Sequence, residues 1–295
     1  MKNKKTLVID GSSLLFRAFF ATAKKTENGW FSPMRNQNGE ATNAIRVFIN
    51  MIFNLVNRYN PDYLLIALDS EKKSFRHDFD FYKSTRSTTP DDLITQFTML
   101  KEFLLAANIK GLEIDGLEAD DVIGSFARNF DTETLIVSGD KDMFQLITKK
   151  DIIVFPDSKT KEYIEYTENK FIEKYDLNPI QMIDLKALMG DSSDNIPGVK
   201  GIGEKTGIKI LKEYKSIENL YSQLENDNFS LSDSVKNKLL VDKENAFLSK
   251  KIATILTTED LGIKISDLTF DLSLSNELKD FLMDNNLYSI LNKYE

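Results

Sequence analysis

The first half of the chain alternates between short apolar runs and segments whose apolar residues recur at helical spacing. Residues 41–59 carry one such stripe, with Ile45, Phe48 and Ile52 on a single face, which predicts a crossover helix. The apolar runs are expected to form buried strands, and they cover residues 6–10, 63–69 and 134–137. Strands that alternate with helices favour an α/β fold with a mostly parallel, doubly wound sheet.

Acidic residues stand at the end of each predicted strand. Asp10 ends the first strand, Asp69 ends the second, and Asp140 and Asp142 follow the third. Because ligands bind beyond the carboxyl ends of the strands in open parallel sheets, we expect these four carboxylates to converge at one edge of the sheet.

A second group of acids, Glu118, Asp120 and Asp121, directly precedes an apolar helical run. Helix capping explains one acid at a helix N-terminus, but it does not explain three. With Asp191 and Asp194 the candidate carboxylates number nine, and such a cluster is too repulsive to persist at neutral pH without cations. Oxygen ligands of this kind favour magnesium or manganese.

Residues 190–206 join the last two of these carboxylates to a glycine-rich turn that opens into a lysine-containing helix. Free N–H groups at a helix N-terminus and nearby lysines bind phosphates. A nucleotide-binding P-loop is one alternative, but Glu204 occupies the position where that motif requires lysine. A plain loop before a surface helix would explain the glycines alone equally well. With the adjoining acids, we predict the hairpin of a helix-hairpin-helix that contacts DNA phosphates through Gly198, Lys200, Gly201, Gly203, Lys205 and Lys209.

Residues 70–89 interleave cations with aromatic rings, among them Arg76, Tyr82, Lys83 and Arg86. This composition is typical of surfaces on which single-stranded bases stack while phosphates meet positive charge. An ordinary solvated loop is the alternative. The position of this segment directly after Asp69 favours a single-strand binding loop beside the predicted acidic site.

Composition narrows the chemistry further. The chain has no cysteine and one histidine, His77, which excludes thiolate sites and a multi-histidine zinc site, so any metal must be held by oxygen. The net charge of −8 argues against a nucleic-acid partner, but 46 acidic residues less the nine candidate ligands leave 37 against 38 basic residues, or +1. No apolar run approaches the roughly 18 residues that a membrane span requires, and we expect a cytoplasmic protein.

The remaining pattern suggests three parts. Residues 24–40 are expected to be a surface loop, residues 151–166 a hairpin, and helices are predicted near Pro90, at 168–175, from Pro179 and over 204–258. We therefore expect an α/β core at 1–178 that includes the loop 70–89, a helix-hairpin-helix unit at 179–258, and a tail at 259–295 that packs on the core.

Several of these segments, taken together, resemble one family. They are Val8-Ile-Asp-Gly-Ser-Ser, Tyr82-Lys-Ser-Thr-Arg86, Glu118-Ala-Asp-Asp-Val-Ile-Gly, Ser138-Gly-Asp-Lys-Asp and Gly190-Asp-Ser-Ser-Asp-Asn-Ile-Pro-Gly. Their order is similar to that of the bacterial 5′-to-3′ exonuclease, or flap endonuclease, family, especially the nuclease domain at the N-terminus of bacterial DNA polymerases. The resemblance covers about residues 6–210. Because no polymerase portion follows, we expect a stand-alone form.

The resemblance implies that residues 1–178 form a PIN-like or FEN-like nuclease core and that the loop 70–89 is an arch-like insertion. It also implies a helical helix-hairpin-helix (H3TH) subdomain at 179–258. It implies two Mg²⁺ ions, which Mn²⁺ can replace, and K⁺ at the hairpin. The ligands implied for the first metal are Asp10, Asp69, Glu118, Asp120 and Asp121. Those implied for the second metal are Asp140, Asp142, Asp191 and Asp194.

The family also assigns the 5′ strand and the scissile phosphate to Arg17, Tyr82, Lys83 and Arg86. One departure concerns Lys83, because five residues separate Arg76 from Tyr82 where the family has six. The expected mechanism is two-metal hydrolysis of DNA phosphodiesters, in which Asp10, Asp120, Lys83 and Arg86 are the catalytic residues.

The implied substrates are DNA with 5′ flaps, nicks or 5′ ends, including RNA primers in RNA-DNA hybrids, in replication and repair. The implied partners are a DNA polymerase and a ligase, with no membrane, and we expect a monomer. Two alternatives remain, a related metal-dependent RNase and a non-catalytic protein that binds DNA structures. The former would not need the hairpin at 198–203, and the latter would lack some of the carboxylates.

Overall fold

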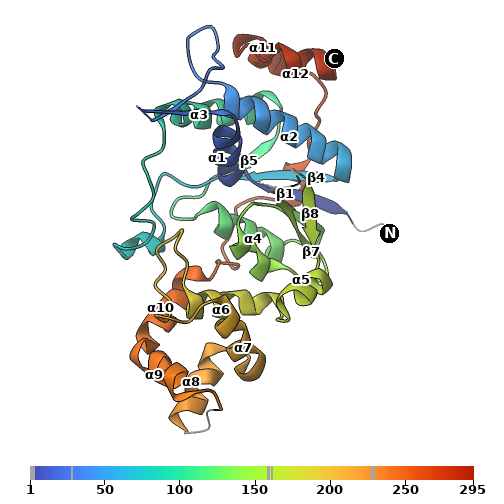
Figure 1. Cartoon of the computed structure of the whole chain (residues 1–295). Helices are drawn as coiled ribbons and strands as arrows, with labels where there is room; N and C mark the ends of the chain where they lie inside the picture. Colours follow the sequence, from blue (N-terminus) through green and yellow to red (C-terminus); the bar gives the residue numbers. More distant parts are fainter. Residues whose placement is uncertain (1–3, 28, 158–159, 161, 227–229) are drawn as a thin grey trace.

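A six-stranded sheet in the order β5-β4-β1-β6-β7-β8 forms the centre of the computed structural model, which describes residues 4–27, 29–157, 160, 162–226 and 230–295 (Figure 1). The four pairs from β5 to β7 are parallel, and β8 runs antiparallel to β7. The predicted mostly parallel α/β sheet is therefore confirmed. The strands are β1 (Lys5–Asp10), β4 (Tyr63–Ala67), β5 (Lys110–Leu112), β6 (Glu133–Val137), β7 (Asp151–Pro156) and β8 (Tyr163–Tyr166).

Two hydrophobic clusters lie on opposite faces of this sheet. Along β1, Leu7 and Ile9 join one cluster while Val8 joins the other, because successive side chains of a strand point to opposite faces. Strands buried on both faces read as continuous apolar runs, which is why the sequence pattern located β1, β4 and β6.

Helices cover both faces of the sheet. One cluster involves α1 (Gly11–Thr22), α2 (Asn43–Tyr59), α3 (Asp91–Ala106), α11 (Asn276–Asp284) and α12 (Tyr288–Tyr294). The other involves α4 (Ala119–Asn129), α5 (Glu168–Tyr175) and the short 3-10 helix η2 (Lys141–Leu146). The tail thus returns to the core after leaving the helical unit, and it packs on α2 and α3.

The helical unit occupies the lower end of the molecule in Figure 1. It contains the 3-10 helix η3 (Pro179–Gln181), α6 (Met182–Met189), α7 (Glu204–Tyr214), α8 (Ile217–Glu225), α9 (Asp233–Val241) and α10 (Lys243–Ala253). Residues 254–258, which we expected to be helical, follow the end of α10 and form neither helix nor strand. Residues 227–229 of that prediction lie outside the described residues.

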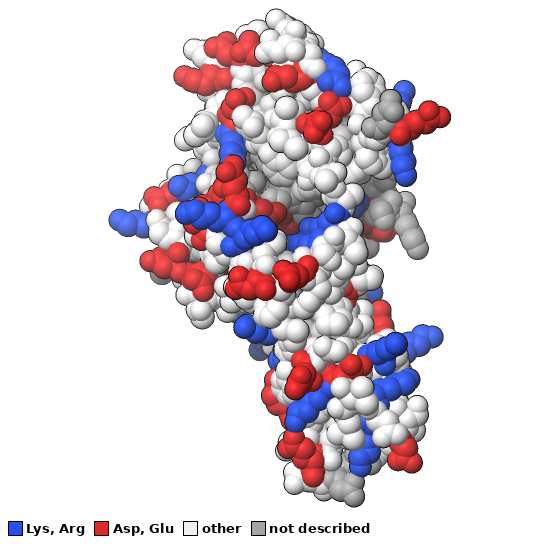
Figure 2. Space-filling model, turned by 90° about the vertical axis from the view of Figure 1, so that its left-hand side faces the viewer, with Lys and Arg blue, Asp and Glu red and all other residues white. Residues whose placement is uncertain are grey.

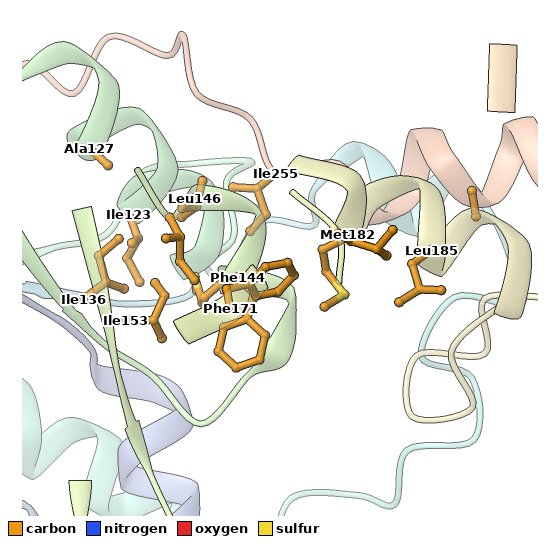
Figure 3. Close-up of a cluster of buried hydrophobic side chains, with 14 of the residues drawn as sticks. Ile123, Ala127, Ile136, Phe144, Leu146, Ile153, Phe171, Met182, Leu185 and Ile255 are labelled. Atoms are coloured by element: carbon orange, nitrogen blue, oxygen red, sulfur yellow. The ribbon is translucent and has the colours of Figure 1, made fainter. Parts of the chain in front are cut away.

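One apolar cluster continues from the sheet into the helical unit. Figure 3 shows Phe144 and Phe171 of the core next to Met182 and Leu185 of α6. Burial of each such side chain is worth roughly 1.5–3 kcal/mol, so α6 is held firmly against the core. The residues that follow α6, which include Asp191 and Asp194, are therefore presented from a fixed position.

Among the strands in the described ranges, β2, β3 and β5 were not predicted. Residues 24–40 contain an antiparallel hairpin, β2 (Lys24–Thr26) with β3 (Gly29–Phe31), in place of an irregular loop. Both strands are exposed, so they lack the apolar alternation that marks a half-buried strand. The edge strand β5 is only three residues long, which is too short for a periodic signal.

None of the helices in the described ranges has both the length and the hydrophobicity that crossing a bilayer requires.

Candidate active site

Five of the predicted acidic residues line one cavity at the carboxyl edge of the sheet. Lys83 and Arg86 line it from the arch-like loop, together with Phe16 of α1. The acids reach this cavity from the end of β1, the segment after β4, the start of α4 and the segment after β6, and they are Asp10, Asp69, Glu118, Asp120 and Asp140. Figure 2 shows Lys and Arg side chains gathered beside a hollow in the middle of this face.

Asp10 is held by the fold before any metal binds. It is the N-cap of α1, where its Oδ1 accepts from the Ser13 N–H at 2.9 Å, and its Oδ2 accepts from the Ser138 hydroxyl at 2.8 Å. Burial and the nearby charge of Asp69 raise the pKa of Asp10 to about 7. Its ionised form therefore lacks sufficient positive charge in its surroundings.

The pKa of the Asp120 carboxyl is also raised. Desolvation, followed by the charges of Asp140 and Asp10, raises the pKa of this half-buried carboxyl well above its ordinary value. Within the described residues, no three acidic side chains yet stand close enough together to hold a metal ion. The donor set nevertheless fits a hard divalent cation, because several oxygen ligands face one cavity and destabilise one another's ionised forms.

Glu118 is already neutralised by the arch-like loop. Its Oε2 accepts from Lys83 Nζ at 2.7 Å and from the Tyr82 hydroxyl at 3.0 Å, while its Oε1 accepts from the Ser74 hydroxyl at 2.6 Å. Burial opposes the charged form, but Lys83 and Ser74 lower the pKa of Glu118 to about 2. This carboxylate therefore stays ionised and fixes the position of Lys83.

The aromatic rings of the arch-like loop pack inward. Tyr82 is buried, and it forms a small cluster with Ile196 and Ile252, against which Phe79 and Phe81 also pack. The prediction that bases stack on these rings is therefore corrected for Tyr82, whose ring is covered and whose hydroxyl supports Glu118.

The shortened spacing before Tyr82 does not remove Lys83 from the site. The loop forms tight turns in which Lys83 adopts a left-handed φ of 54°, and its backbone N–H donates to the Asp194 carbonyl at 3.0 Å. A non-glycine residue in this region costs roughly 1–2 kcal/mol. The strained backbone therefore occurs at a residue whose ammonium group lines the acidic cavity.

The remaining predicted acids are paired with cations of the chain. Arg86 Nη2 lies 2.7 Å from Asp194 Oδ1. Lys186 Nζ lies 2.6 Å from Asp142 Oδ1 and also contacts Asp191 Oδ2. A second cavity, lined by Asp140, Lys186 and Asp191, adjoins this pair, so Asp140 borders both cavities.

Lys186 is a site residue that the sequence analysis missed. It stands within the apolar helical run that leads to Asp191, where a lysine is expected on the solvent-facing side. The structure buries it instead. Its position five residues before Asp191 was the only signal that could have drawn attention to it.

Asp121, predicted to bind metal, and Arg76, predicted to contact DNA, pair with each other in the interior. Asp121 is fully buried and accepts from Arg76 Nη1 at 2.7 Å and Nη2 at 2.9 Å. Arg76 also donates to the Ile252 and Thr254 carbonyls. Because each group satisfies the other in the interior, Asp121 is corrected from a metal ligand, and Arg76 from a DNA contact, to a structural ion pair.

Arg17 of α1 is not among the residues that line the acidic cavity. Its charge acts instead on Tyr163 of β8, where it opposes the rise in the pKa that burial causes. Beyond Phe16, the rings of Phe20 and Trp30 continue along α1 and the β2-β3 hairpin as an exposed aromatic group, which the sequence analysis also missed.

The predicted DNA-contact residues of the hairpin between α6 and α7 are mostly accessible. Lys200, Gly201, Gly203, Lys205 and Lys209 are exposed, whereas Gly198 is buried and its N–H donates to Ser249 Oγ at 2.9 Å.

Two residues of the α9 region hold this hairpin. Lys238 Nζ donates to the Gly201 carbonyl at 3.2 Å, and Asp242 Oδ2 accepts from the Lys200 N–H at 2.9 Å. The hairpin is thus fixed by side chains of the helical unit.

Comparison with known proteins agrees with this arrangement. Residues 5–176 match the family model described as the 5′-3′ exonuclease N-terminal resolvase-like domain, and residues 177–275 match the 5′-3′ exonuclease C-terminal SAM fold. The chain is 38% identical over 277 residues to a 5′-3′ exonuclease of Bacillus subtilis (strain 168), which covers 93% of this chain and 90% of the relative.

A second relative is a DNA polymerase I of Lactococcus lactis subsp. lactis (strain IL1403), which is 42% identical over 288 residues. That match covers 95% of this chain but 32% of the relative, so the chain spans about a third of the length of the polymerase.

Solved structures share the fold. A T5 5′-exonuclease with bound divalent metal ions (zinc) is 22% identical, with a TM-score of 0.67 over 95% of this chain and 99% of that chain. The catalytic core of Rad2 in complex with DNA substrate is 16% identical, with a TM-score of 0.65 over 99% and 93% of the two chains. Because the two family models match consecutively and cover most of the sequence, the chain belongs to the 5′-3′ exonuclease family, as its motif order predicts.

Proposed function

We propose that this nuclease cleaves DNA phosphodiesters at 5′ ends and 5′ flaps with the help of two divalent metal ions, Mg²⁺ or Mn²⁺. The observation that carries the proposal is the single cavity in which Asp10, Asp69, Glu118, Asp120 and Asp140 face Lys83 and Arg86. Mutually repelling carboxylates call for cations, and the adjacent ammonium and guanidinium groups suit a phosphate. The zinc-bound T5 5′-exonuclease of the same fold gives further support.

The first metal would be held by Asp10, Asp69, Glu118 and Asp120, and the second by Asp142, Asp191 and Asp194, with Asp140 between the two groups. Divalent ions in these positions would lower the pKa of an attacking water and stabilise the charge of the transition state.

The chain's own residues would orient the substrate. Lys83 and Arg86 enter the cavity from one loop, so they can hold the scissile phosphate against the carboxylate side. Oriented positive groups of this kind stabilise developing phosphate charge without reorganisation during the reaction. Ser13 and Ser138 keep Asp10 in place through the hydrogen bonds described above.

Duplex binding would use the hairpin between α6 and α7. Its exposed backbone at Gly201 and Gly203, with Lys200, Lys205 and Lys209, offers contacts to the phosphate backbone that do not depend on base sequence. A K⁺ ion at this hairpin is part of the proposal, as are the boundaries 1–178, 179–258 and 259–295 between the three parts of the chain.

The proposed substrates are 5′ flaps, nicks and 5′ ends, including RNA primers in hybrids, and the proposed partners are a DNA polymerase and a ligase in replication and repair. We propose that the nuclease acts as a monomer. The Rad2 core, which has the same fold, is in complex with DNA substrate, and this favours DNA over the alternative RNA substrate.

The test is to incubate the pure protein with end-labelled 5′-flap, nicked-duplex and single-stranded DNA, in EDTA and in Mg²⁺. We expect cleavage that needs Mg²⁺, starts from the 5′ end or flap junction, and is absent in Asp120→Asn. Cleavage that persists in EDTA would contradict the metal role. Cleavage of RNA with no cleavage of DNA would favour the alternative RNase.

A further inference from the structure

Lys186 of α6 is a buried lysine placed between two carboxylates that we assign to the second metal. Its side chain is 9% exposed, and its Nζ lies 2.6 Å from Asp142 Oδ1 and in contact with Asp191 Oδ2. A buried lysine is stable when its charge is paired, and here two carboxylate oxygens lie within ion-pair distance of the Lys186 Nζ. The group is therefore an ammonium ion that already occupies the position between these two oxygens.

The two groups of carboxylates differ in this respect. In the described part of the chain, Asp10 accepts hydrogen bonds from two neutral donors, the Ser13 N–H and the Ser138 hydroxyl, while Lys83 at the same cavity pairs with Glu118. Asp142 and Asp191, in contrast, share one internal cation. A divalent ion at Asp142 and Asp191 therefore has to break existing ion pairs, whereas a divalent ion at Asp10 does not.

An ammonium ion and a divalent ion cannot both lie between the same two carboxylate oxygens, because they repel each other and need the same space. Resting on the proposed two-metal function, we propose that Lys186 is the resident counter-ion of Asp142 and Asp191, and that a divalent ion binds this pair only by displacing the Lys186 ammonium. The two metal sites then fill at different metal concentrations, the second one less readily.

The neighbourhood of Lys186 has room for this displacement. The adjoining cavity is lined by Lys186 itself and by Met182, Met189, Ser193 and Glu204. A lysine side chain has four methylene groups and many rotamers, so its ammonium can leave the two carboxylates while α6 keeps its packing.

The first experiment measures Mn²⁺ binding to the metal-stripped full chain by electron paramagnetic resonance, without DNA. The variant is Lys186→Met, which keeps the length and removes the charge, and the matched control is Lys141→Met, an exposed lysine that lines the same cavity. Nearby charges shift ionic equilibria by about 1–3 pKa units, so we expect the weaker Mn²⁺ site to tighten by about tenfold or more in Lys186→Met. The tighter site and the control should keep their affinities.

The second experiment uses the native protein and therefore does not depend on the folding of a variant. Lysine amines are labelled with an acylating reagent at increasing Mn²⁺ concentration and quantified by mass spectrometry. We expect Lys186 to be protected without metal and to become labelled as the weaker site fills, while Lys141 is labelled throughout.

Lys186 that stays protected at saturating Mn²⁺, or a weaker site that is lost in folded Lys186→Met, would overturn the inference while the metal-dependent function stands. Absence of Mn²⁺ binding at both sites in the native protein would overturn the proposed function as well.

Discussion

Arg76 and Asp121 form a buried ion pair that connects three parts of the molecule. Arg76 lies in the 3-10 helix η1 (Phe75–Asp78) at the base of the arch-like loop, and Asp121 lies in the first turn of α4, next to Asp120. The same guanidinium group binds the Ile252 and Thr254 carbonyls at the end of α10. The arch-like loop, the acidic cavity and the helical unit therefore share one fixed junction.

Arg76→Met is expected to lower the free energy of unfolding by about 3–5 kcal/mol, since it leaves the Asp121 carboxylate buried without a partner. Urea denaturation followed by circular dichroism measures this loss. The control is Lys279→Met, which breaks an exposed pair with Glu295 and should cost less than about 1 kcal/mol. Similar losses of unfolding free energy in the two variants would show that the buried ion pair contributes no more to stability than the exposed one.

Asp120→Asn is expected to abolish cleavage while DNA binding is largely kept, because binding is shared among the cations of the hairpin and the loop. Removal of one acid from a repulsive group should also raise the thermal stability of the metal-free protein. Single-turnover cleavage, fluorescence anisotropy and thermal melts in EDTA test the three effects. Asp115→Asn, which alters an exposed acid paired with Lys72, is the control, and an equal loss of affinity and rate in Asp120→Asn would contradict the assignment.

Lys83→Ala is expected to slow the chemical step by about 10²-fold or more, the scale of one lost preorganised electrostatic contact. Substrate affinity should change less. Single-turnover kinetics with saturating enzyme separate the two, and Lys72→Ala, in the same loop but paired with Asp115, serves as the control. An unchanged rate would assign the role to another cation, with Arg86 the first candidate because it also lines the cavity.

Lys200→Ala combined with Lys205→Ala is expected to weaken duplex-containing substrates for every base sequence and to reduce the salt slope by roughly one unit per lost contact. Binding of single strands should change little. Anisotropy titrations against salt measure both, with Lys264→Ala and Lys279→Ala in the tail as the matched double control. Equal losses on duplex and single-stranded DNA would contradict a duplex-specific hairpin.

Glycine substitutions in the hairpin separate backbone strain from steric exclusion. Gly201 has a φ of +81°, which a branched residue strongly disfavours, whereas Gly203 has a φ of −100° and open space where a Cβ would stand. Gly203→Val should therefore leave thermal stability nearly unchanged and act on duplex binding alone. Gly201→Val should reduce both properties. The same anisotropy assay and thermal melts test this, and a large stability loss in Gly203→Val would contradict it.

The metal-free protein is expected to lose stability as the pH rises from about 4 to about 7. Folding raises the pKa values of Asp10 and Asp142 from 3.8 to about 7, so in this range the folded state holds protons that the unfolded state has released. Stability therefore falls across that window and levels off above it. Glu118, with a pKa lowered from 4.5 to about 2, acts in the opposite direction only below about 4.5.

Thermal melts at about pH 5.5 and about pH 8 test this, first in EDTA and then in Mg²⁺ at equal ionic strength. The midpoint should be lower at the higher pH in EDTA, and Mg²⁺ should reduce the difference because a bound cation replaces the protons. An identical pH dependence in EDTA and Mg²⁺ would contradict the contribution of the cavity acids.

The sequence was sufficient for strands β1, β4 and β6 and for the acids at their carboxyl ends, because continuous apolar runs indicate buried strands and parallel topology brings their ends together. Asp10, Asp69 and Asp120 could be assigned to one site from the sequence alone, and the structure places them at one cavity. The exposed β2-β3 hairpin and the three-residue β5 lacked any periodic pattern, so they could not be found this way.

Pairings between distant charges were the part that the sequence could not predict. Asp121 and Asp120 are adjacent and chemically identical, yet α4 turns Asp121 toward Arg76 while Asp120 lines the cavity. Likewise, the burial of Lys186 depends on how α6 packs against the core, which no local pattern encodes. Side-chain direction around a helix, set by tertiary packing, decided both cases.

The packing of the tail on α2 and α3 has a consequence for the order of synthesis. The ring of Phe281 lies 6.0 Å from that of Phe103 on α3, and the ring of Tyr294 lies 4.1 Å from that of Phe53 on α2. About 170 residues separate the end of α3 from the start of α11, which a ribosome adding roughly 5–20 residues per second completes in roughly 10–30 s. During that interval the apolar surface of α2 and α3 is not yet covered by α11 and α12. This surface of the nascent chain is therefore accessible to chaperones.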